Sequence, residues 1–88
     1  MSSEIILKRQ ADKDSAQIRV WRFVGHPSAL HINRESLICM VAGEPPAEGL
    51  RAATPYRLVK LDTQTYQLAP TEYKLTKSNE PKTIRLIK

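Results

Sequence analysis

The sequence predicts a small, mainly β protein: an antiparallel barrel or curled sheet of five to six short strands with one short helix. Short runs rich in β-branched and aromatic residues recur along the 88 residues, and polar or proline-containing turn signals separate them. An open α+β sheet covered by the helix stays as the alternative, because three glycines are few for the tight corners of a barrel. A chain of this length forms a single small domain, residues 1–88.

The first two predicted strands, residues 4–9 and 17–24, form a hairpin. Both are rich in β-branched residues, and 17–24 is the best strand signal in the chain. The polar segment 11–15 between them contains Asp12 and Asp14, and aspartates favour turns because their side chains bond nearby backbone amides.

Residues 33–43 are ambiguous between helix and strand. Asn33 is a good helix N-cap, and Gly43 lies where a left-handed C-cap residue is needed. The continuous apolar run 37–42 is equally typical of a buried strand. We expect a short helix at 34–42 because both end signals are present, and the strand stays open as the alternative.

The second half of the chain has a stronger β pattern. Prolines and a glycine make 44–55 a loop region, since proline cannot extend a helix or occupy a central strand. Turn signals at 62–64 and 77–81 then divide the remaining sequence. The predicted strands are residues 56–61, 65–68, 71–76 and 83–87.

Charge divides the chain unevenly. The formal net charge of +5 comes entirely from residues 51–88, which carry eight basic and three acidic residues, whereas residues 1–50 carry six of each. Charge gathered in one region predicts a directed positive surface rather than general solubility. The sequence thus predicts a positive patch in the C-terminal half of the fold.

One face of the second strand has two interpretations. Arg19, Trp21 and Phe23 share this face, because side chains alternate along a strand. They belong to the core if both sides of the sheet are covered. If the face is open, its aromatic and guanidinium groups suit stacking on nucleobases or a protein hot spot.

No catalytic or metal site is predicted. His26, His31 and Cys39 are too few, and too unlike a set of converging ligands, for a metal centre. Cys39 lies in an apolar run, where burial makes a thiol inert. It is the single cysteine of the sequence, which excludes an internal disulfide. Phosphate-cradling glycine loops are also missing from the sequence. We expect a non-enzyme without a cofactor.

The sequence contains neither a signal peptide nor an apolar run of the roughly 20 residues that a membrane span requires. We therefore expect a cytoplasmic protein with no membrane partner. The apolar segment Ile84–Ile87 would be able to pair with a second copy if it lies at a sheet edge, so a homodimer is a further possibility.

Size, charge and the aromatic strand together favour a non-catalytic nucleic-acid-binding module. The alternative is an accessory or regulatory subunit that docks on an acidic protein partner in a larger assembly. Both hypotheses use one surface, with cations contacting phosphates or carboxylates and Trp21 or Tyr73 stacking. The predicted site residues are Arg19, Trp21, Tyr73, Lys74, Lys77, Lys82, Arg85 and Lys88.

Overall fold

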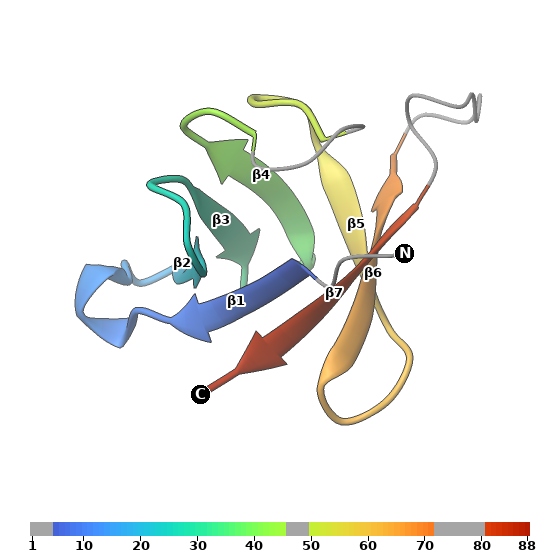
Figure 1. Ribbon diagram of the computed structural model, residues 1–88, viewed down its shortest axis with the longest axis horizontal. Coiled ribbons are helices and arrows are strands. Elements are labelled where there is room, and N and C mark those ends of the chain that lie inside the picture. Colours follow the sequence, from blue (N-terminus) through green and yellow to red (C-terminus); the bar gives the residue numbers. More distant parts are fainter. Residues whose placement is uncertain (1–4, 46–49, 72–80) are drawn as a thin grey trace.

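Seven strands form a closed barrel in which each strand pairs with its neighbour in the chain (Figure 1). The computed structural model describes residues 5–45, 50–71 and 81–88. The strands are β1 (Ile5–Arg9), β2 (Ile18–Phe23), β3 (Ala29–Asn33), β4 (Ile38–Ala42), β5 (Tyr56–Lys60), β6 (Thr65–Pro70) and β7 (Lys82–Ile87). The predicted fold class, a small β-barrel, is confirmed, with more strands than the five to six expected.

The first and last strands close the barrel. β1 and β7 lie side by side and run parallel, with Ile5 opposite Ile84 and Leu7 opposite Leu86, whereas every other neighbouring pair of strands is antiparallel (Figure 1). β7 also pairs with β6 along its other side. The Ile84–Ile87 segment is therefore not a free sheet edge, and it no longer provides a reason to expect a homodimer.

The short helix lies elsewhere than expected. It is a 3-10 turn, η1 (Ala11–Lys13), between β1 and β2, and the expected helix at 34–42 is wrong because β4 occupies this segment. The signals that suggested a helix are real but serve a hairpin. The Asn33 side chain accepts hydrogen bonds from the amides of Glu35 and Ser36, each at 2.9 Å, and Gly43 has a positive φ of 96° where β4 ends.

β3 is the strand that the sequence pattern did not predict. It alternates cleanly, with Leu30 and Ile32 buried and His31 exposed between them, so a two-residue pattern was present in the sequence here. Two predictions are confirmed: the 4–9 and 17–24 hairpin is β1 and β2, and the Asp62 turn joins β5 to β6. The strand predicted at 71–76 lies, apart from its first residue, outside the described residues.

The barrel has one closed and one open end. At the closed end, Leu50 from the β4–β5 connection packs into the core at 4% exposure, and Val41 makes a parallel bridge with Ala52. Tyr56 is buried there at 2% exposure, and its hydroxyl accepts a hydrogen bond from the Arg51 amide at 2.9 Å. The open end lies where β2, β4 and β6 begin and where β1, β3, β5 and β7 finish.

Candidate binding site at the open end of the barrel

The open end is ringed by side chains that continue the inward-facing pattern of the strands. Side chains alternate across a strand, so a residue two positions beyond a core residue points to the same side. Thus Arg19 follows the direction of Trp21, and Lys60 follows that of Leu58. In strand order, the residues around this opening are Arg19, Arg34, Leu37, Lys60, Tyr66 and Lys88.

Below these residues lies a hollow with an apolar floor. The deep hollow has a volume of about 260 Å³, and the core residues that line it are Trp21, Ile32, Leu58 and Leu86. A wider outer hollow of about 610 Å³ shares Trp21, Tyr66 and Leu86 with it and extends to Lys88. A mostly apolar depression with polar groups at its edge is the usual form of a small-ligand site.

Four cations form what we call the basic rim: Arg19, Arg34, Lys60 and Lys88. All four are exposed, and they come from four different strands or strand ends. No acidic side chain is among the described residues that line either hollow. Glu35 does line a smaller depression beside Arg19 and Arg34, at the outer edge of the rim. Among the described residues, the side chains that line the two hollows therefore include cations and no carboxylate.

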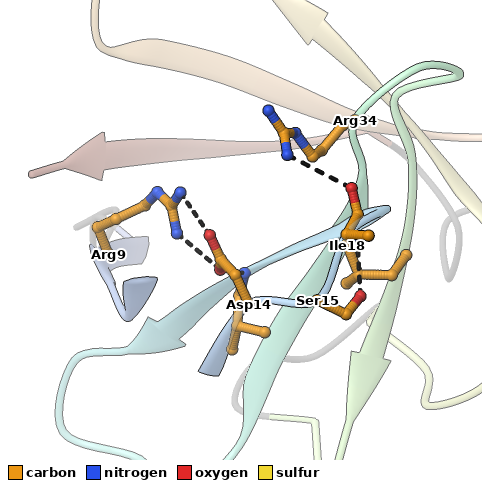
Figure 2. Close-up of polar contacts among 7 residues, drawn as sticks. Arg9, Asp14, Ser15, Ile18 and Arg34 are labelled. Atoms are coloured by element: carbon orange, nitrogen blue, oxygen red, sulfur yellow. Dashed lines mark hydrogen bonds and ion pairs between the residues drawn. The ribbon is translucent and has the colours of Figure 1, made fainter. Parts of the chain in front are cut away.

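Two of the nearby arginines are held in place. Figure 2 shows the Arg9 guanidinium facing Asp14, with contacts of 2.7 and 2.8 Å, while Arg34 donates to the backbone carbonyl of Ala16 at 3.3 Å. The hydrogen bond from Arg9, together with that from the Val20 amide, holds the pKa of Asp14 below its usual range. The charge of Arg9 is thus balanced by Asp14, so Arg9 is not counted in the basic rim.

Arg9 also determines what Trp21 offers to a ligand. Its guanidinium lies over the Trp21 ring, 5.6 Å from the ring centre, and the Trp21 side chain is only 6% exposed. The interpretation of Trp21 and Phe23 as core residues is therefore correct, and the prediction that Trp21 is an open stacking platform is wrong. Tyr66 is half-buried and lines both hollows, so it is the aromatic ring that a ligand would contact.

The predicted site residues do not form one patch. Arg19 and Lys88 lie on the basic rim, but Lys82 begins β7 at the opposite end of the barrel. Arg85 lies between the buried residues Ile84 and Leu86 of β7, so its exposed side chain is on the outer face of the barrel. Tyr73, Lys74 and Lys77 lie outside the described residues. The expectation of a single positive patch from residues 51–88 therefore fails for the described part of that half.

The predicted site residues did not include Arg34, Leu37, Lys60 or Tyr66. The signal that would have found Lys60 and Tyr66 is the two-residue step, since they follow and precede the core residues Leu58 and Leu68 at this step. Arg34 was missed because β3 itself was not predicted. The two-residue step identifies candidates on each strand separately. Only closure of the barrel brings the ends of these strands into one ring and shows that the candidates lie together.

Cys39 belongs to the core rather than to the site. It is fully buried, and desolvation raises the pKa of its thiol to about 12. His26 and His31 are exposed, and His31 faces away from the core on β3. Within the described ranges, no three histidine, cysteine or acidic side chains gather as a metal site would require.

No family model, curated protein or solved structure matches this chain. In the described part of the chain, no helix has the length and apolar character needed to cross a membrane.

Proposed function

We propose that this protein is a non-catalytic module that binds single-stranded nucleic acid at the open end of its barrel. The observation that carries the proposal is the basic rim around an apolar floor with an accessible aromatic ring. Sequence-tolerant binders of single strands combine cationic side chains for phosphates with aromatic side chains on which bases stack.

The charges support a phosphate ligand more than a general anion. Arg19 and Arg34 present guanidinium groups, which match the geometry of phosphate oxygens, and Lys60 adds an ammonium group across the opening. Phosphate neutralisation by such groups releases condensed counterions from the strand. Binding that depends on them weakens steeply as salt rises.

The aromatic side chain supports bases as the second element of recognition. Tyr66 lies on β6 opposite Lys60 of β5, so a stacking ring and a cation are adjacent at the rim. A base on Tyr66 would keep its neighbouring phosphate close to Lys60. Tyr66 takes the stacking role that the sequence suggested for Trp21, whereas the predicted role of Tyr73 concerns a residue outside the described ranges.

An acidic protein partner is the second candidate, and Leu37 favours it. This side chain is 45% exposed at the rim and has a positive φ of 60°, which is unfavourable for a residue with a branched side chain. An exposed apolar residue beside Arg34 and Lys60 would suit an acidic peptide that carries one apolar anchor.

The test compares matched charge removals on one strand. Lys60→Gln removes a rim cation, and Arg57→Gln removes an exposed cation on the outer face of the same strand. Binding of a fluorescent oligothymidylate is measured by anisotropy, with a labelled polyglutamate peptide as the comparison ligand. We expect Lys60→Gln to weaken oligothymidylate binding several-fold and Arg57→Gln to leave it near the parent value.

Two outcomes contradict the proposal. If the parent binds no oligothymidylate even at low salt, nucleic acid is not the ligand. If it binds polyglutamate more tightly and Lys60→Gln affects that binding instead, the acidic partner becomes the better assignment. Far-UV circular dichroism of each variant verifies that the barrel is intact.

A further inference from the structure

The dimensions of the open end limit how much of a strand can enter it. The deep hollow measures about 260 Å³, below the roughly 300–1,000 Å³ of sites that enclose drug-sized ligands. Its floor consists of buried core side chains, including Ile32 and Leu58, so it does not extend deeper into the barrel. Of the two aromatic side chains among the described residues that line it, Trp21 is buried and Tyr66 is half-buried, so the hollow offers one partly exposed ring on which a base can stack.

Only part of its wall is available for contact with such a ring. Trp21 lines the hollow but is only 6% exposed, so the more exposed Tyr66 and Leu37 are the apolar side chains that offer most contact area. They belong to strand ends on either side of Lys60 in the order of the barrel. A planar base that enters the hollow would therefore meet Tyr66, the partly exposed ring, with Leu37 as a second apolar contact.

The cations surround this hollow instead of forming a line. Arg19 and Arg34 belong to β2 and the end of β3, whereas Lys60 and Lys88 belong to β5 and the end of β7. A backbone that crosses the opening therefore meets a cation before and after the base that dips into it. A groove that tracks many phosphates would need its cations along one direction.

We infer that the open end accepts one unpaired nucleobase, with the phosphates that precede and follow this base contacting cations on different sides of the basic rim. The inference rests on the proposed function, because it specifies how the same site engages a single strand. Neighbouring bases contribute little, because the wider outer hollow adds the polar side chains of Thr63 and Gln64 but, among the described residues, no aromatic ring beyond those of the deep hollow.

The experiment uses short strands in which abasic residues keep every phosphate but remove the bases. The full chain is titrated with three labelled strands of equal length: fully abasic, one central thymidine, and two adjacent central thymidines. One thymidine is expected to tighten binding about 5- to 150-fold over the fully abasic strand, the range of one stacked base. A second adds no more than the twofold that an extra binding register gives.

Tyr66→Leu isolates the contribution of the base. This variant keeps an apolar side chain at the same position of β6, so the barrel is expected to fold. It is expected to bind the fully abasic strand like the parent and to lose most of the gain from the thymidine. Gln67→Thr is the control, because Gln67 follows Tyr66 and therefore faces the outside of the same strand, and this variant is expected to retain that gain.

The outcomes separate this inference from the proposed function. If the second thymidine tightens binding as much as the first, more than one base is held and the inference is overturned, while nucleic-acid binding stands. If the fully abasic strand binds as tightly as the others, the hollow is not used and the inference is again overturned. If no strand binds, the proposed function itself fails.

Discussion

The salt dependence of strand binding tests whether the basic rim acts as a unit. Each phosphate neutralised on a single strand contributes about −0.7 to the slope of log affinity against log salt concentration. The four cations of the rim therefore predict a slope of about −2.8 if each one meets a phosphate. A fourfold rise in salt, from about 50 to about 200 mM, then weakens binding about 50-fold.

Removing two rim cations should halve this dependence. Arg19→Gln combined with Lys60→Gln leaves two contacts, so the slope becomes about −1.4 and the same change in salt weakens binding about sevenfold. The matched control is Arg22→Gln with Arg57→Gln, which removes two positive charges from the same two strands but on their outer faces. The control is expected to keep the parent slope.

Fluorescence anisotropy with a labelled oligothymidylate, repeated over a salt series, measures these slopes. The parent and rim-variant lines are expected to converge near about 1 M salt, where the counterion contribution disappears. Equal slopes for the rim variant and the parent would show that phosphates do not bind at the open end. A loss of slope in the outer-face control would show that only net charge matters.

Three further predictions concern single positions. Leu37→Gly is expected to change the free energy of unfolding in urea by less than about 1 kcal/mol, because glycine tolerates the positive φ at this position and this offsets the lost side-chain contacts. The variant is expected to bind oligothymidylate more weakly, and unchanged binding would show that Leu37 is not part of the site. Asp14→Asn is expected to lower the melting temperature near neutral pH, because the lowered pKa of Asp14 shows that the folded chain stabilises the ionised carboxylate. The difference from the parent should begin to shrink near pH 3.8 and disappear only as pH falls through the lower pKa of the folded chain; a difference that persists in stronger acid would contradict the pairing with Arg9. At mildly alkaline pH, Cys39 is expected to react with a thiol reagent about a thousandfold more slowly in the folded chain than in urea. The reason is that burial raises the pKa of the thiol from 9.0 to about 12, which lowers the fraction of reactive thiolate by about that factor; equal rates would contradict its burial.

Local sequence patterns predicted much of this fold because the elements carry their own signals. β2 combines β-branched and aromatic residues, and the β5–β6 turn is held by Asp62, whose carboxylate accepts hydrogen bonds from the amides of Gln64 and Thr65. Those bonds also hold the pKa of Asp62 below its usual range. Such signals depend on a few neighbouring residues, so they can be interpreted without tertiary context.

The errors arose where one signal serves two structures. Asn33 binds amides two and three residues ahead both in a helix cap and in the turn that precedes β4, so its presence does not distinguish them. Leu37 then adopts a left-handed conformation, which a helix does not allow and which no pattern indicates for leucine. The outcome was decided by pairing of β4 with β3 and β5, which is tertiary information.

The site depended even more on long-range structure. Arg19 was selected from its strand face. Arg34 and Lys60 can be recognised as site residues only once β3 and β5 are known to end at the same opening. Counting charges by sequence half pointed instead to Lys82 and Arg85, which lie on one strand but at different places on the barrel. Barrel closure, not composition, brings the relevant cations together.

The parallel seam between β1 and β7 has a consequence for synthesis of the chain. Ile5 pairs with Ile84, so β1 has no partner on this side until β7, the strand of the barrel that is synthesised last, has been made. Contacts so distant in sequence form slowly, because a long loop must close first. Until then the nascent sheet presents open edges that can recruit other unfinished chains. Shortening the chain before β7 would make this transient hazard permanent.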